Sequence, residues 1–500
     1  MKVLIANRGE IAIRIMRACR EMNMTSVAVY SEADANARHT RFADEAICIG
    51  PASASQSYMN IVAILKAAQE TGADAIHPGY GFLSENEAFA NAVEDAGLIF
   101  IGPRPEVIHQ MGNKLIACQV AEQAGLPVLK SLNIEISDIK QAVSLCKDLK
   151  FPVLAKAVSG GGGRGIREAN SLEELEQVIA AASEEAAAVF GNQSVYLEPL
   201  VRNARHIEVQ ILGDGKGTVL ILGERECSIQ RRRQKLIEEA PAPNLTDGLR
   251  KQIHWAAWQL GKSLNYRSLG TVEFLLDPDG HFYFIEVNPR IQVEHPVTEF
   301  VTGVDLVATQ LYLAQTGELP YQQHQIRVQG SAIEARIIAE IPELGFMPDT
   351  GTITELCEPQ GPGVRIDSAM FTGMEVTTDY DSMLGKLIVW ADNREAAVRR
   401  MQCALKEFRI CGIKTDLPFL TQILQSQSFL KARFDTTYLD HNQPTLLENA
   451  KNQHGKLIAL ALAKMLHEEQ TTSTPARPTP LLMKNSFNPW RMAAVQEQVR

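Results

Sequence analysis

The 500-residue chain contains no run of apolar residues that approaches the roughly 20 needed for a membrane-spanning helix. Its eight cysteines are scattered without a Cys-x-x-Cys pair, so they predict reduced cytoplasmic thiols rather than a zinc site or a disulfide framework. The formal net charge of −10 argues against nonspecific nucleic-acid binding, which depends on neutralising phosphates. Met1 and Lys2 lead directly into the apolar run Val3–Ala6, which predicts a strand rather than a signal peptide. We therefore expect a cytoplasmic protein that binds neither nucleic acid nor membrane.

The composition is that of an ordinary globular protein, with 45% hydrophobic and 22% charged residues. Five hundred residues exceed what one hydrophobic core usually organises, so two to four domains are expected. The first 110 or so residues alternate strand and helix patterns, which predicts an α/β fold with a doubly wound parallel sheet. The first turn, Asn7–Glu10, is not a Gly-x-Gly-x-x-Gly motif, so a dinucleotide site is not expected there. The predicted strands are 3–6, 26–30, 73–76 and 98–101, and the predicted helices are 10–22, 61–71 and 87–96.

Two loops that follow predicted strands are candidates for ligand binding. His77–Gly81 comes after a strand end, where ligands of α/β sheets collect, although the same residues could form only a tight turn. Ser159–Gly165 follows the strand Phe151–Ala157 and is rich in glycine, but it lacks the lysine-serine ending of a P-loop. Its amides could cover a polyphosphate as a mobile lid, or the segment could be a flexible linker. Lys156 on the preceding strand favours the lid.

Residues 286–294 carry the strongest chemical signal in the chain. In an extended strand, alternate side chains share one face, and every even position of this run is charged or an amide. The odd positions are apolar, so the run predicts an active-site wall for a metal and an anion. A strand with a solvated polar side is the alternative, which the strongly apolar neighbouring segments argue against. The polar positions are Glu286, Asn288, Arg290, Gln292 and Glu294.

A hairpin is predicted just before this run, with its turn at Asp277–Gly280. If Leu276 pairs with His281, then Glu273 faces Phe284 and Glu286 is a diagonal neighbour of Glu273. Two carboxylates on one face, with Asn288 beside them, would suit a hard cation such as Mg²⁺, which takes oxygen ligands.

Five motifs occur in order over roughly residues 1–445, and together they resemble the biotin carboxylase component of biotin-dependent carboxylases, an ATP-grasp enzyme. The resemblance implies three domains: an N-terminal α/β domain at 1–112, an ATP-grasp domain at 113–325 with a mobile lid at about 131–203, and a C-terminal α/β domain at 326–445. Residues 446–500 are expected to hold a helix, a Thr/Pro-rich linker and the start of a connecting domain. The five motifs are Ala6–Ala12, His77–Asn86, the GGGGRG loop, Glu239–Pro243 and Arg290–Glu299.

The resemblance also implies a reaction in two steps. Bicarbonate attacks the γ-phosphate of ATP to give carboxyphosphate, which breaks to CO₂ and phosphate, and N1 of biotin captures the CO₂. The expected cofactors are ATP, Mg²⁺ or Mn²⁺, and biotin as a carrier-bound substrate. The expected partners are a biotin carboxyl carrier protein or domain and a carboxyltransferase subunit, within an oligomer. This would be the first half-reaction of an acyl-CoA carboxylase.

Lys114 and Lys156 match the family's ATP-phosphate lysines. A lysine is a compact point charge against phosphate, and phosphoryl transfer depends on positioning and on neutralised charge. A lone histidine such as His206 would more often be structural, but its neighbours match a nucleotide-binding strand. The other implied ATP contacts are Gly161, Gly162 and Gly163 in the loop, Glu198 and Val201 at the adenine hinge, and His206 with Glu208 on one strand face.

The bicarbonate pocket is implied by five positions. Arg290, Gln292 and the backbone of Val293 resemble its binding residues, because a planar guanidinium fits a carboxylate-like anion. Glu294 is then the candidate base that deprotonates bicarbonate. Lys235 matches a lysine near bicarbonate and the γ-phosphate, although it ends a basic run of a kind that is usually solvated.

The metal and biotin contacts complete the implied site. Glu273 and Glu286 match the family's Mg²⁺ ligands, with Asn288 beside them. Arg336 resembles the arginine that steadies the biotin enolate, a charge placed where charge develops, although a strand arginine is usually a surface ion pair. Tyr80, together with the glycine that follows it, is expected near biotin.

The chain departs from the family pattern in a few places. Arg233 stands where many relatives have His or Asn, and Pro199, which lacks a backbone donor, stands where several have Lys in the adenine hinge. Gly361–Arg365 lies where the bacterial stand-alone subunit has an aromatic residue at its dimer contact, which argues against a simple homodimer. Asn488–Arg491 resembles the start of the connecting domain of single-chain α subunits, but the chain has no Ala-Met-Lys-Met motif. We expect a fragment of a longer α subunit or a subunit with a separate carrier.

Two other functions stay open from the sequence. Another ATP-grasp ligase, such as a relative of carbamoyl-phosphate or D-alanine ligases, would share the lysines and the metal carboxylates, but not Arg290–Glu299 together with Arg336. An inactive scaffold of a carboxylase complex would not need the matched catalytic positions, all of which are present.

Overall fold

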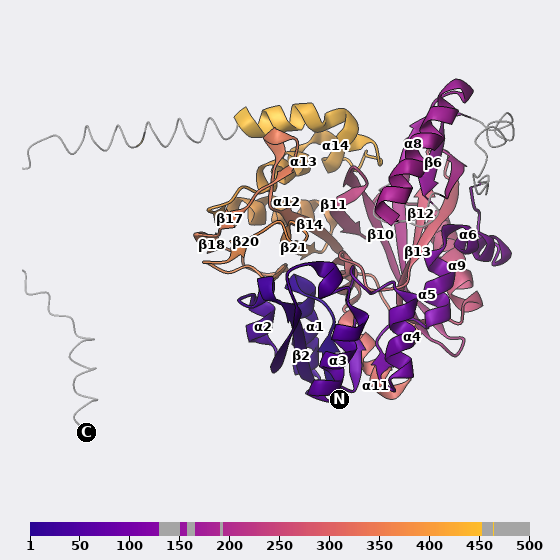
Figure 1. The fold of residues 1–500 in the computed structure, drawn as a ribbon. Coiled ribbons are helices and arrows are strands. Elements are labelled where there is room, and N and C mark those ends of the chain that lie inside the picture. Colours follow the sequence, from indigo (N-terminus) through magenta and orange to yellow (C-terminus); the bar gives the residue numbers. More distant parts are fainter. Residues whose placement is uncertain (130–150, 158–165, 191–193, 453–463, 465–500) are drawn as a thin grey trace, which may run out of the picture. The chain divides into compact units, whose positions relative to one another are not determined.

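The computed structural model describes residues 1–129, 151–157, 166–190, 194–452 and 464 (Figure 1). The chain divides into two units, Met1–Leu447 and Glu448–Arg500. Gly161, Gly162 and Gly163 lie outside the described residues, as do the Thr/Pro-rich linker and much of the predicted lid. Of the helix expected within residues 446–500, residues 446–452 are helical, and most of the remaining residues lie outside the described part. Within that part, no helix is long and apolar enough to cross a membrane.

The N-terminal part is a five-stranded parallel sheet in the order β3-β2-β1-β4-β5, which confirms the predicted doubly wound fold. The sequence analysis missed β3, a short strand in which three of the six residues are exposed and only Ile49 is buried. The strands are β1 (Lys2–Ile5), β2 (Thr25–Ser31), β3 (Glu45–Gly50), β4 (Ala75–His77) and β5 (Ile99–Phe100). The helices of this part are α1 (Gly9–Glu21), α2 (Arg38–Phe42), α3 (Ile61–Thr71), α4 (Glu87–Asp95) and α5 (Pro105–Gly112).

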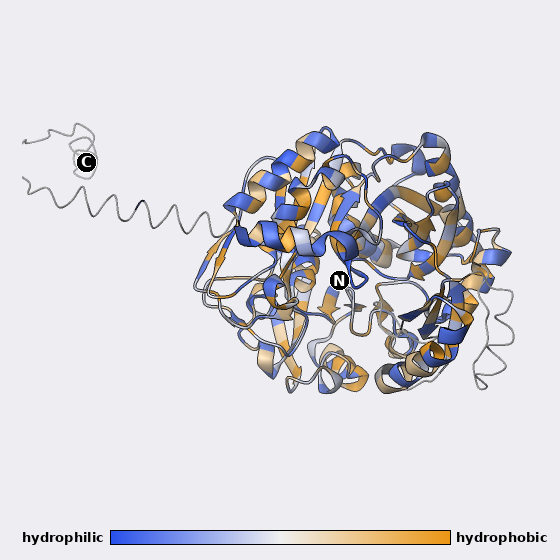
Figure 2. Cartoon of the chain, turned by 90° about the horizontal axis from the view of Figure 1, so that it is seen from above, coloured by the Kyte–Doolittle hydropathy of each residue, from blue (hydrophilic) through white to orange (hydrophobic). Residues whose placement is uncertain are grey.

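Alternation along β1 explains why helices cover both faces of this sheet. Val3 and Ile5 pack in one core cluster with Ile11 of α1, whereas Leu4 packs in another with Ile64 of α3. Successive side chains of a strand point to opposite faces, so an apolar strand of this kind needs an apolar helix surface on each side. The helices supply these surfaces, and the helices drawn in Figure 2 carry both hydrophilic and hydrophobic residues.

An eight-stranded antiparallel sheet forms the centre of the first unit, in the order β13-β12-β9-β10-β11-β14-β21-β19. It continues without interruption from strands of the predicted ATP-grasp domain into strands of the predicted C-terminal domain, because β11 pairs with β14. The strands are β9 (Arg205–Asp214), β10 (Val219–Arg231), β11 (Gln234–Ala240), β12 (Arg267–Leu276), β13 (Phe282–Asn288), β14 (Ser331–Ile338), β19 (Val364–Ser368) and β21 (Met383–Ala391).

A separate three-stranded sheet, β7-β6-β8, packs against helix α8 through the apolar residues of both. It comprises β6 (Val153–Ala157), β7 (Ile166–Ala169) and β8 (Val195–Pro199). The remaining helices are α6 (Lys114–Gln123), α8 (Leu172–Phe190), α9 (Asp247–Ser263), α10 (His295–Thr302), α11 (Leu306–Thr316), α12 (Arg394–Glu407), α13 (Leu417–Gln425) and α14 (Gln427–Leu430). The short strands are β15 (Glu340–Ile341), β16 (Met347–Pro348), β17 (Gly351–Thr352), β18 (Glu355–Cys357), β20 (Glu375–Val376) and β22 (Arg409–Cys411).

The predicted hairpin is present, but its register differs from the prediction. Leu276 pairs with Phe282, and a bulge between Glu273 and the next residue places Glu273 directly opposite Glu286. The prediction that Glu273 faces Phe284 is therefore wrong, because the loop is one residue longer and the bulge adds another offset.

The predicted strand over residues 286–294 is also wrong beyond Asn288. Strand β13 ends there, and the next residue is Pro289, which has no N–H to donate to a neighbouring strand. The chain then turns, and α10 begins at His295. The polar side chains of the run are consequently presented by a strand end and a turn rather than by one strand face.

Candidate active site

Four neighbouring strands place one row of charged residues across the large sheet. Arg225 of β10 is the register partner of Glu208 on β9, Glu208 is the partner of Glu273 on β12, and Glu273 is the partner of Glu286 on β13. Residues directly opposite in a sheet lie within contact distance. Along β9, the charged positions alternate with core residues such as Val209, so one face of the sheet is apolar and the other forms the site.

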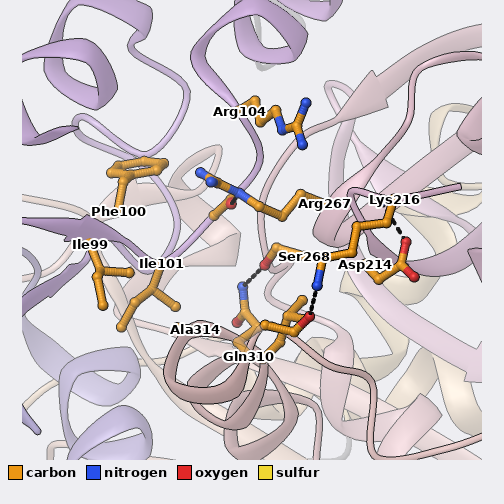
Figure 3. Close-up of a pocket in the computed structure, with 13 residues that line it drawn as sticks. Ile99, Phe100, Ile101, Arg104, Asp214, Lys216, Arg267, Ser268, Gln310 and Ala314 are labelled. Carbon is orange, nitrogen blue, oxygen red and sulfur yellow. Dashed lines mark hydrogen bonds between the residues drawn. The ribbon is translucent and has the colours of Figure 1, made fainter. Parts of the chain in front are cut away.

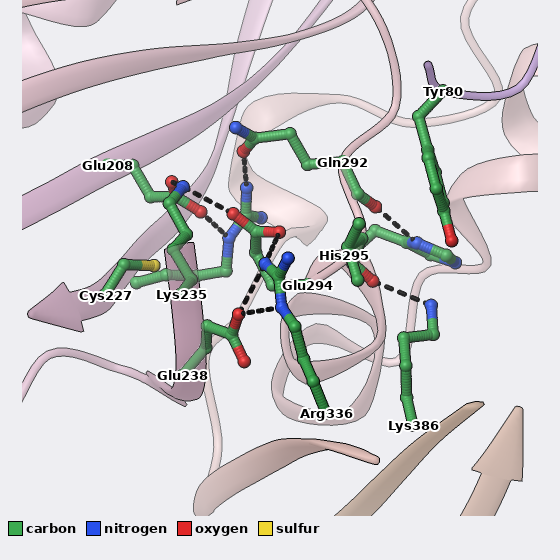
Figure 4. Close-up of polar contacts among 12 residues, drawn as sticks. Tyr80, Glu208, Cys227, Lys235, Glu238, Gln292, Glu294, His295, Arg336 and Lys386 are labelled. Atoms are coloured by element: carbon green, nitrogen blue, oxygen red, sulfur yellow. Dashed lines mark hydrogen bonds and ion pairs between the residues drawn. The ribbon is translucent and has the colours of Figure 1, made fainter. Parts of the chain in front are cut away.

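Lys235 of β11 is the central cation of this face (Figure 4). Its Nζ lies 2.5 Å from Glu208 Oε2, 3.0 Å from Glu273 Oε1 and 2.6 Å from Glu294 Oε1. Burial lowers the pKa of Lys235, but the three carboxylates outweigh that effect and hold the pKa well above its usual value. Lys235 is therefore charged at neutral pH, and the ammonium holds together three side chains from separate parts of the chain.

Arg336 joins this cluster from β14. Its Nε donates to Glu238 Oε1 at 2.7 Å, and its Nη2 donates to Glu294 Oε2 at 2.9 Å. Burial raises the pKa of Glu294, but Lys235, Arg336 and Arg225 together lower it below the ordinary carboxylate value, so Glu294 is ionised. Burial raises the pKa of Glu238 to about 7 against the opposing effect of Arg336. The pKa of Glu238 thus lies near neutral pH, whereas Glu294 is ionised at that pH.

Arg225 is a member of the site that sequence reasoning missed. Its side chain is fully buried, contacts Glu208 through Nε and donates to Gln292 Oε1 at 2.8 Å. It also donates to the amide oxygen of Gln210 and the hydroxyl of Thr298, both at 2.8 Å. Its local sequence gives no distinct signal, because it stands between two other charged residues of strand β10, Glu224 and Glu226. Glu238 was missed as well, and it is likewise fully buried on β11.

The turn after β13 brings its polar residues back to the cluster. Gln292 Nε2 donates to Glu273 Oε1 at 2.7 Å, and Asn288 Nδ2 donates to the same oxygen at 2.9 Å. Arg290 Nη2 donates to Asn288 Oδ1 at 2.9 Å, and its Nε lies 3.3 Å from Glu85 Oε2. The structure therefore places Arg290, Gln292 and Asn288 beside Glu273, although they are not on one strand face.

The nucleotide candidates fall into two groups. His206 Nε2 lies 2.8 Å from Glu273 Oε2, within the main cluster. Lys114, at the start of α6, lies 3.6 Å from Glu286 Oε2, and Lys156 of β6 contacts Glu198 of the neighbouring strand. Val201 follows β8 and is half-buried.

Three cations from three separate segments converge near β6. Burial, together with the charges of Lys114 and Arg233, lowers the pKa of Lys156 to about 7 against the opposing effect of Glu286. Positive charges that repel one another in this way are typical of a site that receives a polyanion.

The predicted metal ligands offer the chemistry that a hard cation requires. Glu273 and Glu286 face each other across β12 and β13, and Asn288 adds an amide oxygen at the end of β13. All three are oxygen donors, which suit Mg²⁺ and Mn²⁺. Glu273 is buried and bonded to its neighbours, whereas Glu286 is 29% exposed and faces Lys114, so Glu286 is the more accessible ligand.

A cavity of about 270 Å³ lies elsewhere, between the end of β5, the β9–β10 turn and α11 (Figure 3). None of the predicted site residues lines it. Arg104 at its edge donates to the carbonyl of Gly215 at 2.9 Å, and Lys216 donates to that of Gly317 at 2.8 Å. Arg104 and Lys216 thus fix the loops beside the cavity by binding their carbonyl groups.

Three family models match successive parts of the chain. The biotin carboxylase N-terminal domain matches residues 1–108, the ATP-binding domain of the carbamoyl-phosphate synthase L chain matches 113–322, and the biotin carboxylase C-terminal domain matches 334–441. The chain belongs to the biotin carboxylase family. The resemblance drawn from the sequence motifs is therefore confirmed, together with its three-domain architecture.

Individual biotin carboxylases are similar over nearly their full length. The biotin carboxylase of a Nostoc species is 48% identical over 438 residues, which are 88% of this chain and 98% of that protein. The biotin carboxylase of Allochromatium vinosum is 50% identical over 440 residues, covering 88% of this chain and 98% of the relative. The biotin carboxylase domain of Hydrogenobacter thermophilus 2-oxoglutarate carboxylase, solved with MgADP, ADP and bicarbonate, has a TM-score of 0.86 and 46% identity, covering 89% of this chain and 98% of that structure.

Proposed function

We propose that this biotin carboxylase uses the cluster around Glu294 to carboxylate N1 of carrier-bound biotin with ATP and bicarbonate. The observation that supports this most directly is the position of Glu294, which lies between Lys235 and Arg336. One cation would face the phosphate and bicarbonate side, and the other would face biotin. Because both cations contact this one carboxylate, it lies between the place where carboxyphosphate would form and the place where biotin would be carboxylated.

Glu294 is the base that takes the proton of bicarbonate in this proposal. Lys235 and Arg336 keep it ionised at neutral pH, so it can accept a proton, but the same cations make it a weak base. Substrate anions that bind Lys235 and Arg336 would weaken the effect of these two cations on Glu294. The pKa of the Glu294 carboxyl would then rise, which makes it a stronger base. The base would then become effective only when the substrates are in place.

Arg290, Gln292 and the backbone of Val293 form the bicarbonate pocket in this proposal. The guanidinium of Arg290 presents a planar fork to a planar anion, and Gln292 is held in place by Glu273 and Arg225. The bicarbonate oxygen that attacks phosphate would lie beside Lys235.

Lys114 and Lys156 neutralise the phosphates of ATP, and the adenine hinge includes Glu198 and Val201. We assign Gly161, Gly162 and Gly163 to the loop that covers the phosphates, and His206 with Glu208 to the nucleotide side of the sheet. Glu273, Glu286 and Asn288 would hold Mg²⁺ or Mn²⁺, which supplies charge neutralisation between phosphate oxygens. Phosphoryl transfer requires mainly such positioning and charge, which these residues provide.

Arg336 faces the developing enolate of biotin, and Tyr80 lines the same side. Biotin carboxylase subunits act in biotin-dependent carboxylase complexes with carrier and carboxyltransferase parts. For this chain we propose an oligomeric assembly with a biotin carboxyl carrier protein or domain and with a carboxyltransferase subunit. We propose an acyl-CoA as the molecule that finally receives the carboxyl group. The site residues of this chain do not select that acceptor, because a partner carries out the second half-reaction.

We also propose domain boundaries of 1–112, 113–325 and 326–445, with the lid at about 131–203. The described cysteines are all free thiols, which supports a cytoplasmic location.

Bicarbonate-dependent hydrolysis of ATP, measured with and without free biotin, tests this function. We expect biotin to stimulate hydrolysis in the wild type, and the variants Lys235→Ala and Arg336→Ala to lose the stimulation. Hydrolysis that is indifferent to biotin would favour another ATP-grasp ligase. No hydrolysis in the presence of a carrier protein and all substrates would favour an inactive scaffold.

A further inference from the structure

The turn between β13 and α10 is held from behind by two buried side chains. His295 is fully buried and its Nδ1 donates to the carbonyl of Gln292 at 2.8 Å. Lys386 of β21 is also fully buried, and its Nζ donates to the carbonyl of Val293 at 2.7 Å (Figure 4). Two successive carbonyls of the turn are thus fixed by side chains that are not among the predicted site residues.

These two contacts determine where the next two amides point. A trans peptide group is planar, so its N–H points opposite to its C=O. When Lys386 holds the Val293 carbonyl, the N–H of Glu294 points away from Lys386, and His295 orients the N–H of Val293 in the same manner. Neither N–H has a protein acceptor among the described residues. Adjacent free amides at the start of a helix form a receptor for an anion.

Lys386 is itself tied to the N-terminal part of the chain. Its Nζ lies 3.2 Å from Glu10 Oε1 of α1 and 4.0 Å from Asp367 Oδ2 of β19. The same Glu10 oxygen accepts a hydrogen bond from the hydroxyl of Tyr80, which lies in the loop after β4. Burial lowers the pKa of Lys386, but Glu10 and the other nearby carboxylates raise it, so the ammonium is charged. The three predicted domains therefore meet at one buried ammonium.

We propose that Lys386 is a positioning residue for bicarbonate: it holds the Val293 carbonyl and so aims the Glu294 amide at the anion. The ion pair with Glu10 fixes Lys386 itself, which makes the geometry of the anion site depend on the contact between the N-terminal and C-terminal parts. This inference rests on the function proposed above, and it assigns to Lys386 a role in binding bicarbonate that is separate from binding ATP.

The test compares Michaelis constants for the two substrates in the full chain. Lys386→Met removes the donor and keeps much of the side-chain volume, and the double variant Lys386→Met with Glu10→Gln avoids a buried unpaired carboxylate. Loss of an oriented, charged hydrogen bond should raise the KM for bicarbonate about tenfold or more, with the KM for ATP within about twofold of wild type. Arg394→Met is the matched control, because Arg394 also pairs with a buried carboxylate, that of Glu239, and lies outside the predicted machinery.

Selective loss of bicarbonate affinity in the double variant, with both constants unchanged in Arg394→Met, supports the role of Lys386. Equal changes in the KM values for bicarbonate and ATP, or an unchanged KM for bicarbonate, would overturn the proposed role of Lys386. If Lys386→Met alone does not fold, the double variant provides the test. A wild-type protein without bicarbonate-dependent ATP hydrolysis would instead overturn the proposed function, so the two failures are distinguishable.

Discussion

Lys235 and Glu294 form a buried ion pair, with 2.6 Å between Nζ and Oε1, although they are 59 positions apart in the sequence. Glu208 and Glu273 share the same ammonium. One cation thus balances several buried acids, so the catalytic and the structural consequences of its removal should appear together.

Lys235→Met should abolish measurable bicarbonate-dependent ATP hydrolysis and also lower the free energy of unfolding by about 3–5 kcal/mol, because it leaves buried carboxylates without their partner. Denaturant unfolding at pH 7 measures the second effect. Lys66→Met is the control, since Lys66 is exposed on α3 and should change stability by less than about 0.5 kcal/mol. A Lys235→Met protein as stable as the wild type would show that the three carboxylates do not depend on this ammonium.

Arg336→Ala should lose the stimulation of ATP hydrolysis by biotin, while the slow hydrolysis without biotin persists. The reason is that Arg336 faces biotin in the proposed mechanism, whereas Lys235 faces the phosphate side. Steady-state rates over a range of free biotin measure this effect. Arg250→Ala is a control, because Arg250 pairs with Glu224 at the start of α9 and should retain the stimulation. Stimulation that survives Arg336→Ala would remove this arginine from the biotin site.

ATP binding should be coupled to proton uptake above neutral pH. Burial and neighbouring cations lower the pKa of Lys156 to about 7, so the side chain is largely protonated at pH 6 and largely neutral at pH 8.5. A bound polyanion favours the charged form and raises that pKa, so binding at pH 8.5 should take up as much as about one proton, with little uptake at pH 6. Calorimetric titrations in buffers of different ionisation enthalpy measure the uptake.

Lys156→Arg provides the control for that experiment. A guanidinium stays protonated throughout this pH range, so this variant should take up no proton from this position at pH 8.5. Equal uptake by the wild type and the variant would assign the proton to another group.

The two predicted metal carboxylates should differ in their effects. Glu286→Gln should raise the Mg²⁺ concentration needed for half-maximal ATP hydrolysis about tenfold with little loss of stability, because the contact of Glu286 with Lys114 is long. Glu273→Gln should also destabilise the fold by about 1–3 kcal/mol, because Lys235, His206, Asn288 and Gln292 all contact its oxygens. Activity titrated with Mg²⁺ at fixed ATP, together with denaturant unfolding, measures both. An unchanged Mg²⁺ requirement in Glu286→Gln would remove Glu286 from the metal site.

Local periodicity predicted much of the fold and part of the site. The alternation of strand and helix in the first 110 residues predicted the parallel sheet, and the alternation of polar positions pointed to Glu286 and Asn288. These signals lie within a few neighbouring residues, and a sequence displays them directly. The prediction failed after Asn288, where the strand ends before Pro289. It rested only on the alternation of polar and apolar residues, and a proline fits that alternation although it cannot donate a hydrogen bond to the sheet.

Neighbouring residues in the sequence do not show which side chains form the buried charged cluster. Arg225 and Glu238 have charged neighbours in their strands and Lys386 is the one charged residue of β21, and each becomes part of the site only through the register of its strand. A loop one residue longer than predicted, together with a bulge of one residue, changed the partner of Glu273 from Phe284 to Glu286. Register depends on loop lengths and on packing between distant segments, so composition and spacing could not supply it.

The pairing of β11 with β14 has a consequence for how such proteins can be recombined. Glu238 and Glu334 are partners across this pair, in the middle of one sheet. Separating the chain between these strands would expose a long unpaired edge in each half, and unpaired edges invite aggregation. The central and C-terminal regions should therefore be inherited, exchanged or transplanted between carboxylases as one piece, even though family models describe them as two.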